Sequence, residues 1–187
     1  MKKLVILAAL CSAAFPAYAD GGNKLHARLI GLEEVPSVST VARGEFEAEI
    51  SRDEQLIDFR LSYTGLQGTI TQAHIHVGQR HTSGAIVVWL CGTATNPGPA
   101  GTQVCPPSTA AEVTITGTIR AADVVVPPAT TNTQQITAGE LNEVIDAIRA
   151  GAAYANVHTN LSGTGEIRGQ IRTNRGGGGD DRGHGHH

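Results

Sequence analysis

Residues 44–50 read Gly-Glu-Phe-Glu-Ala-Glu-Ile, an alternation of charged side chains with apolar or small ones. Successive side chains of an extended strand point to opposite faces, so this alternation predicts one face against a core and the other against water. Residues 56–63, Leu-Ile-Asp-Phe-Arg-Leu-Ser-Tyr, repeat the pattern. Both segments are therefore predicted to be strands that are buried on one side.

The period of two dominates from residue 24 to residue 126. Further short strands are predicted at residues 25–32, 70–77, 85–90 and 113–119, with a closing strand at 167–171. Each is bounded by Gly, Pro, Asn, Asp or Ser, the residues that favour turns. This spacing is typical of an all-β protein with an antiparallel sandwich or barrel.

One segment has helical periodicity instead. Thr137 and Glu140 have the spacing of a capping box, with Thr137 as the N-cap. Gly151 follows as the expected C-cap. The apolar residues that fall on one helical face are Leu141, Val144, Ile145 and Ile148. We expect one short helix that packs on the sandwich and leads into the strand at 154–158.

The N-terminal residues predict an export signal, and the C-terminal residues predict a flexible tail. Lys2 and Lys3 precede an apolar run at residues 4–15 and the sequence Ala-Tyr-Ala at 17–19. This order predicts a signal peptide over residues 1–19, too short for a permanent membrane helix. One domain would then occupy residues 20–175, and a flexible Gly/His-rich tail residues 176–187. The expected location is the periplasm or the exterior, with no membrane association after cleavage.

The net charge and the cysteine content limit the possible binding partners and the possible roles of the cysteines. The formal net charge is −3, which argues against nucleic acid as a partner because phosphate binding needs a basic patch. Cys11 leaves with the signal peptide, so Cys91 and Cys105 remain. An even pair in an oxidising compartment predicts a disulfide. The alternative is a pair of thiolate metal ligands.

Three histidines form the candidate site. His74 and His76 lie two apart in a predicted strand and therefore share a face, from which neutral imidazoles could reach one ion at about 2.0 Å. His158, in a second β-like segment at 156–159, would complete a three-histidine site if the two segments lie side by side. The alternative is a hydrogen-bonded polar core, in which each unmet donor or acceptor costs about 1–3 kcal/mol.

Five blocks of the chain resemble the CHRD domain, a family named for chordin, from about residue 25 to 172. They are Leu-Ile-Gly-Leu-Glu-Glu-Val-Pro at 29–36, Tyr-Thr-Gly-Leu at 63–66, Ala-His-Ile-His at 73–76, Tyr-Ala-Asn-Val-His-Thr at 154–159 and Gly-Glu-Ile-Arg-Gly-Gln at 165–170. The resemblance implies an immunoglobulin-like Greek-key sandwich whose outline is similar to copper/zinc superoxide dismutase. Bacterial members are usually secreted, and the family name alone implies no activity.

Copper, as Cu2+, is the favoured ion and zinc the second, because nitrogen ligands bind Cu2+ more tightly. Water is the expected fourth ligand. Glu34 and His26 are candidates for an additional ligand, although a solvent-facing position is the favoured expectation for both side chains. Glu166 and Arg168 are candidates for support behind the histidines. Trp89 is expected to alternate into the core together with Val87, and stacking beside the metal site is the alternative.

These features favour a periplasmic or secreted metal-binding protein for copper storage, delivery or protection. Its expected partners are the metal ion and a metallochaperone or another periplasmic protein. One alternative is a copper-dependent oxidoreductase of the superoxide dismutase kind, and another is a metal-free interaction or adhesion module. The chain has no Ser-His-Asp, phosphate-loop or dinucleotide motif, so no catalytic residue is assigned.

Overall fold

A computed structural model describes residues 23–108, 112–126 and 134–174 of the protein. The signal peptide expected at residues 1–19 and the tail expected at 176–187 lie outside these ranges, so both stay predictions. Within the described ranges, no helix has the length and apolar character needed to cross a membrane.

The described residues form nine strands in one sheet, and every pairing between the strands is antiparallel. The strands are β1 (Lys24–Ile30), β2 (Arg43–Ile50), β3 (Leu56–Thr64), β4 (Ile70–Val77), β5 (Ala85–Cys91), β6 (Val113–Arg120), β7 (Ala153–Thr159), β8 (Ile167–Gln170) and β9 (Arg172–Thr173). Their order is β5-β4-β7-β8-β1-β2-β3-β6, and β9 pairs with β1.

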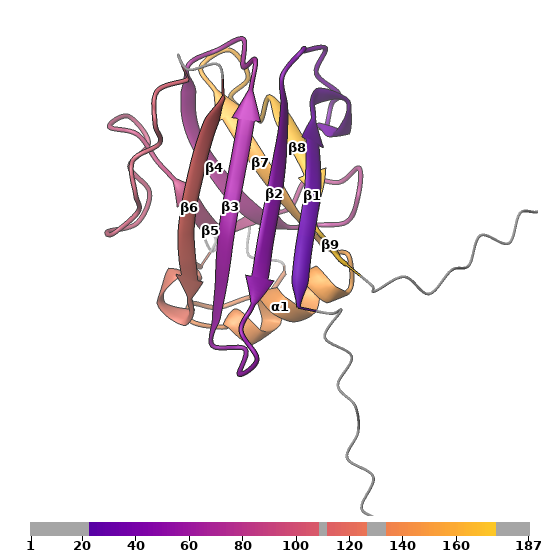
Figure 1. The fold of residues 1–187 in the computed structure, drawn as a ribbon, viewed down its shortest axis with the longest axis vertical. Coiled ribbons are helices and arrows are strands. Elements are labelled where there is room, and N and C mark those ends of the chain that lie inside the picture. Colours follow the sequence, from indigo (N-terminus) through magenta and orange to yellow (C-terminus); the bar gives the residue numbers. More distant parts are fainter. Residues whose placement is uncertain (1–22, 109–111, 127–133, 175–187) are drawn as a thin grey trace, which may run out of the picture.

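The sheet curls into a nearly closed, barrel-like sandwich (Figure 1). In that view β1, β2, β3 and β6 form the near layer, while β4, β5, β7 and β8 lie behind it. The two layers join where β8 pairs with β1. The predicted all-β, antiparallel fold with one short helix is confirmed.

The alternating side chains of β2 and β3 line the core as expected. Phe46 lies opposite Leu61 in the sheet, and both are buried. Glu45 and Glu47, on the other face of β2, are exposed. Burial of each such apolar side chain stabilises the fold by about 1.5–3 kcal/mol, so the alternation itself sets which face of each strand turns inward.

The helix α1 (Leu141–Arg149) lies across one end of the barrel (Figure 1) and buries the four apolar residues that define its face. Its start differs from the prediction, because Glu140 and not Thr137 precedes the first helical residue. Gly139 has a φ of 88°, which interrupts a helical path from Thr137. The Glu140 carboxylate still accepts a hydrogen bond from the Thr137 N–H (2.7 Å). Gly151, with a φ of 69°, follows the helix as expected.

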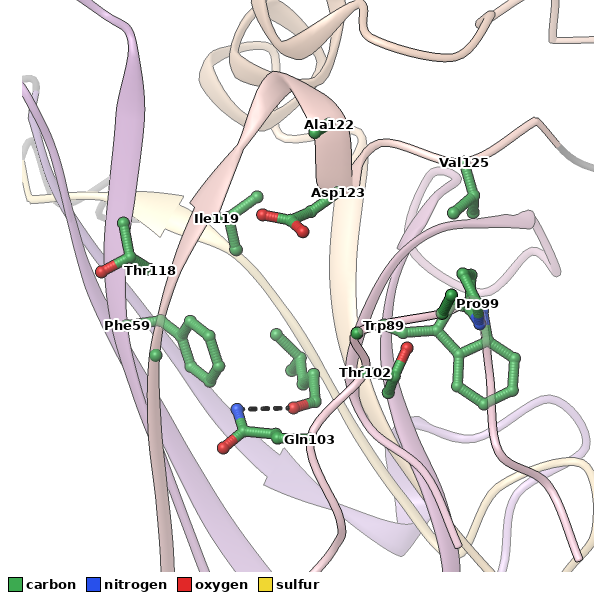
Figure 2. Close-up of a pocket in the computed structure, with 14 residues that line it drawn as sticks. Phe59, Trp89, Pro99, Thr102, Gln103, Thr118, Ile119, Ala122, Asp123 and Val125 are labelled. Atoms are coloured by element: carbon green, nitrogen blue, oxygen red, sulfur yellow. Dashed lines mark hydrogen bonds between the residues drawn. The ribbon is translucent and has the colours of Figure 1, made fainter. Parts of the chain in front are cut away.

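The edge strands β5 and β6 face each other across the one open seam of the described sheet. The side chain of Gln103 spans this seam, since its Nε2 donates to the carbonyl oxygens of Leu90 in β5 (3.0 Å) and Thr116 in β6 (3.2 Å). Figure 2 shows Gln103 beside a cavity of about 120 Å³ between these strands. The predicted disulfide between Cys91 and Cys105 is present and closes the loop that carries Gln103.

Candidate metal centre

The histidine cluster is built by the pairing of β4 with β7. Gln72 of β4 lies opposite His158 of β7, and His74 and His76 follow on the same face of β4. One ring nitrogen from each of the three histidines lies within 4.8 Å of the other two. The convergence expected from the sequence is therefore observed, while the binding of a metal by these residues stays a prediction.

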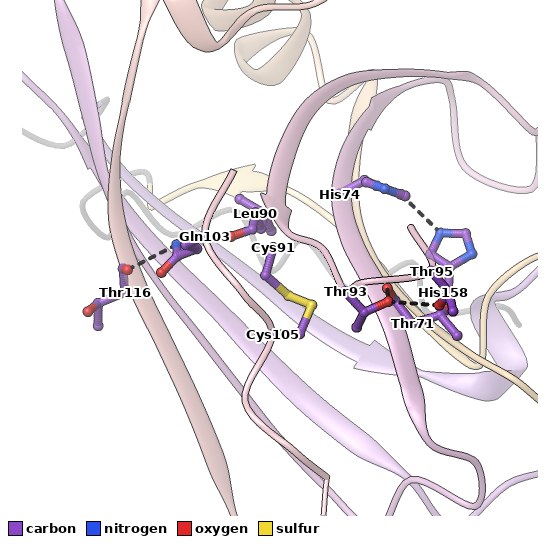
Figure 3. The surroundings of a disulfide bond; sticks show 10 residues. All are labelled: Thr71, His74, Leu90, Cys91, Thr93, Thr95, Gln103, Cys105, Thr116 and His158. Carbon is purple, nitrogen blue, oxygen red and sulfur yellow. Dashed lines mark hydrogen bonds between the residues drawn. A yellow bond between two sulfur atoms is a disulfide. The ribbon is translucent and has the colours of Figure 1, made fainter. Parts of the chain in front are cut away.

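The spacing of the rings suits a shared ion. His74 Nδ1 and His158 Nε2 are 3.2 Å apart (Figure 3). Two nitrogens that each lie about 2.0–2.1 Å from an ion at a tetrahedral angle are separated by about 3.3 Å. The same distance also permits a hydrogen bond between the two rings, so the protein can hold the pair in place before an ion arrives.

Backbone carbonyls orient two of the rings. His76 Nδ1 lies 3.0 Å from the Gly84 oxygen, and His158 Nδ1 lies 3.0 Å from the Gly163 oxygen. A carbonyl can only accept, so each Nδ1 carries the proton and each Nε2 keeps its lone pair. Such contacts are typical of metal-binding histidines, because they fix both the tautomer and the ring orientation.

Two ring nitrogens are left without a protein partner. Nε2 of His74 and Nε2 of His76 are buried and accept or donate no hydrogen bond among the described residues. The three rings are enclosed, with exposed fractions of 0% for His74, 7% for His76 and 5% for His158. Buried polar atoms in native proteins are almost always satisfied. An ion held by His74 Nδ1, His158 Nε2 and His76 Nε2 would satisfy the second of these atoms, His76 Nε2.

Burial also holds the rings in their neutral form. Desolvation, followed by repulsion from His158 and His76, lowers the pKa of His74 to about 2. Desolvation lowers the pKa of His76 to about 4 against the opposing effect of the Gly84 carbonyl, and it lowers the pKa of His158 as well. The neutral imidazole is the form that binds metals, and all three rings are in this form at neutral pH.

Aromatic rings enclose the cluster. Trp89 meets the His74 ring edge to face, with centroids 4.2 Å apart, and Tyr154 stacks on His76 at 4.6 Å. The expectation that Trp89 alternates into the core with Val87 is wrong, because Trp89 is only partly buried and lies against His74. Bulges in the pairing of β4 with β5 shift the register there, so simple alternation fails.

Four further residues were candidates for an additional ligand or for support behind the histidines. Among the described residues, none of them places a ligand atom within the group formed by the three histidine nitrogens. Glu34 is buried and accepts a hydrogen bond from Asn156 Nδ2 (2.6 Å). Desolvation raises the pKa of Glu34 to about 7, against the opposing charge of Arg168. The buried Arg168 guanidinium lies 3.4 Å from the centroid of the Tyr154 ring. It thus supports the ring that stacks on His76.

Glu166 and His26 lie away from the ring nitrogens. Glu166 is buried, and both of its carboxyl oxygens are occupied by hydrogen bonds from other protein groups. His26 is exposed in a separate surface hollow with Arg28 and Arg172. His26 thus takes the solvent-facing position that was the favoured expectation for it, and not the position of an additional ligand.

Sequence reasoning missed the carbonyls of Gly84 and Gly163 that orient the rings. Each carbonyl lies in a glycine-containing turn next to a strand that carries a histidine of the cluster. That closeness in sequence was the only signal from which these hydrogen bonds could have been predicted. It also missed how close the disulfide lies: Cys91 is paired with Ala73, the residue before His74. Figure 3 shows the disulfide and the two histidines on neighbouring segments.

The fold and the site together define a β-sandwich protein with an enclosed three-histidine cluster that could hold a metal ion. The family model of the CHRD domain matches residues 25–171. The chain therefore belongs to the CHRD domain family, as its sequence blocks suggested. No curated protein and no solved structure matches the chain.

Proposed function

We propose that this chain is an exported metal-binding protein, periplasmic or secreted, that holds one copper ion through His74, His76 and His158. The ligand chemistry favours copper, as Cu2+ on affinity for nitrogen alone, with zinc second. The protein would serve copper storage, delivery or protection. A metallochaperone or another periplasmic protein would exchange the ion with it.

One observation carries this proposal: three neutral imidazoles converge in a buried site, with one nitrogen of each within 4.8 Å of the others and with His76 Nε2 unpartnered among the described residues. A purely structural polar cluster would be expected to satisfy its own nitrogens, since each unmet one costs about 1–3 kcal/mol. A bound ion replaces that cost with coordination bonds.

The enclosure supports a binding role over turnover. An oxidoreductase needs an open coordination position and a path for its substrate. Here every ligand ring is at most 7% exposed, and Trp89 and Tyr154 pack against two of the rings. Access to the ion would require movement of these walls.

Elemental analysis after metal loading tests the proposal. We expect one copper per chain in a background where His184, His186 and His187 are changed to Asn, which removes the histidines at the end of the chain. The triple variant His74→Ala, His76→Ala, His158→Ala should retain none, whereas the exposed-site controls His26→Ala and His81→Ala should retain one. Equal metal content in the triple variant and its parent would refute the proposal.

A further inference from the structure

We infer that the three-histidine site selects a monovalent ion, Cu+, over Cu2+ and Zn2+. This inference rests on the proposed function and refines it, because it names the charge of the ion that the site retains. It follows from the charge, the number and the enclosure of the ligands.

The ligand set carries no negative charge. The nitrogens of His74, His76 and His158 are neutral donors, and among the described residues no carboxylate or thiolate joins their group. A divalent ion would therefore leave a net charge of +2 in a site where the rings are 0–7% exposed. The free-energy cost of burying an uncompensated charge is large, and it rises steeply with the size of the charge. A monovalent ion halves the charge to be buried.

The charged groups around the site do not remove this penalty. Arg168 places a buried cation on Tyr154, whose ring contacts His76, and its positive charge disfavours further positive charge there. Glu166 directs both oxygens to other donors. Glu34 accepts a hydrogen bond from Asn156, and its burial raises its pKa to about 7, so at neutral pH it supplies only part of a negative charge.

The number of protein ligands also favours Cu+ over Cu2+ and Zn2+. Zinc held by three histidines takes water as its fourth ligand, and Cu2+ prefers four or more ligands in a tetragonal arrangement, so either ion needs at least one ligand beyond the three rings. Cu+ has a filled d shell and is stable with two or three nitrogen donors. Of the aromatic neighbours, the Trp89 indole N–H is a donor only, and the Tyr154 hydroxyl already accepts a hydrogen bond from the Gly84 N–H (3.2 Å), so neither offers a strong fourth ligand.

Competition titrations on the full chain test the inference, in the same background with the C-terminal histidines changed to Asn. Bicinchoninate competes for Cu+ under ascorbate without oxygen, glycine competes for Cu2+, and a chromophoric chelator competes for Zn2+. Ag+ serves as a monovalent probe that does not change oxidation state. Trp89, the one tryptophan of the chain, reports binding by fluorescence because it contacts His74. We expect Cu+ to bind at least about 100-fold more tightly than Cu2+, and Ag+ to be bound in the presence of excess Zn2+.

A charge variant tests the stated cause. Gln72 lies opposite His158 in the sheet, so Gln72→Glu adds a carboxylate beside the site. It should narrow the preference for Cu+ over Cu2+ at least about tenfold, whereas Gln55→Glu, on an exposed turn, should leave it unchanged. An unchanged preference in Gln72→Glu would overturn the charge argument.

Different results would refute the preference for Cu+ and the proposed metal-binding function. If Cu2+ or Zn2+ binds through the three histidines as tightly as Cu+, the inference is overturned and the proposed metal-binding function stands. If no ion binds at one per chain, or if binding survives the triple histidine variant, the proposed function itself is wrong.

Discussion

At the scale of single residues, His74 is the side chain whose role in function and in stability can be separated. It is fully buried, and its Nε2 has no partner among the described residues, so in the metal-free protein it contributes an unsatisfied atom. Its Nδ1 contacts His158 Nε2. Replacement by Leu removes one unsatisfied atom and creates another on His158, while the volume stays similar.

We therefore expect His74→Leu to leave the free energy of unfolding of the metal-free protein within about 1 kcal/mol of the parent. The affinity for the ion should fall at least about 100-fold, because one of three ligands is lost. Urea denaturation of the metal-free form and a competition titration measure the two effects. A loss of more than about 3 kcal/mol with unchanged affinity would show that the histidine is structural.

The lowered histidine pKa values make the metal-free fold acid-sensitive. The unfolded chain protonates these rings near pH 6.5, whereas His74 and His76 have folded pKa values of about 2 and about 4, and that of His158 is also lowered. Between pH 6.5 and pH 4 the unfolded state binds more protons, so stability falls as pH falls. Glu34 opposes this trend between pH 7 and pH 4.5, because its folded pKa is raised to about 7.

From pH 7 to pH 5, His74 and His76 each lower the free energy of unfolding by about 2 kcal/mol, Glu34 raises it by about 2 kcal/mol, and His158 lowers it further, so we expect a net fall of at least about 2 kcal/mol. Urea denaturation at a series of pH values measures this slope for the metal-free protein. The slope should be shallower in His74→Leu, which removes one titrating ring. A stability that rises over this interval would contradict the buried, neutral state of the cluster.

At the scale of elements, Glu166 connects three loops at the end of the barrel opposite α1. Its Oε1 accepts from Thr40 Oγ1 (2.9 Å) and from the Gln67 N–H (2.8 Å). Its Oε2 accepts from the Gly68 N–H (3.3 Å) and from Thr159 Oγ1 (2.9 Å). The β1–β2, β3–β4 and β7–β8 connections are thus held by one buried carboxyl group.

Glu166→Gln should destabilise the protein by about 2–3 kcal/mol, because the amide nitrogen of Gln would meet donors where the carboxyl oxygen accepted. Hydrogen exchange at the amides of Gln67 and Gly68 should accelerate together with this loss. Glu45→Gln, on the exposed face of β2, serves as the matched control and should change stability by less than about 0.5 kcal/mol. An equal effect in the two variants would remove the special role of Glu166.

Alternation predicted the strands well where pairing is regular. The bounds of β4 match residues 70–77, and β2 and β3 lie where their charge alternation placed them. Trp89 was misplaced because the bulged register of β5 cannot be read from spacing. The role of Glu166 was also hidden, since two of its donors are backbone groups 98 and 99 residues away and belong to no local motif.

At the scale of the whole molecule, the site depends on strand order. His74 and His158 meet because β7 pairs with β4, after the chain has passed through β5, β6 and α1. A period of two indicates strands but does not state which of them are neighbours. The convergence was therefore a conditional prediction, and the antiparallel β4–β7 pairing supplies the missing condition.

The side chain of Gln103 links β5 and β6 across the seam between these two edge strands, and its contribution to stability can be measured. Gln103 Nε2 donates to both edge strands, and Gly117 leaves the room, since a Cβ there would lie 3.1 Å from that nitrogen and 2.7 Å from the Phe59 ring. Gln103→Leu removes both hydrogen bonds and leaves the carbonyls of Leu90 and Thr116 without this donor. We expect a loss of about 1–3 kcal/mol in unfolding free energy.

Hydrogen exchange should locate this loss in the protein. Amides of β5 and β6 should exchange faster in Gln103→Leu, because edge strands that lose a side-chain link open more readily by local fluctuation. Amides in the β1–β2–β3 layer should keep their rates, since each of those strands is paired on both sides. Gln55→Leu, on an exposed turn, is the matched control. Uniform acceleration across all strands would mean that the seam unfolds only with the whole barrel, and that Gln103 contributes to global stability without holding a separate edge.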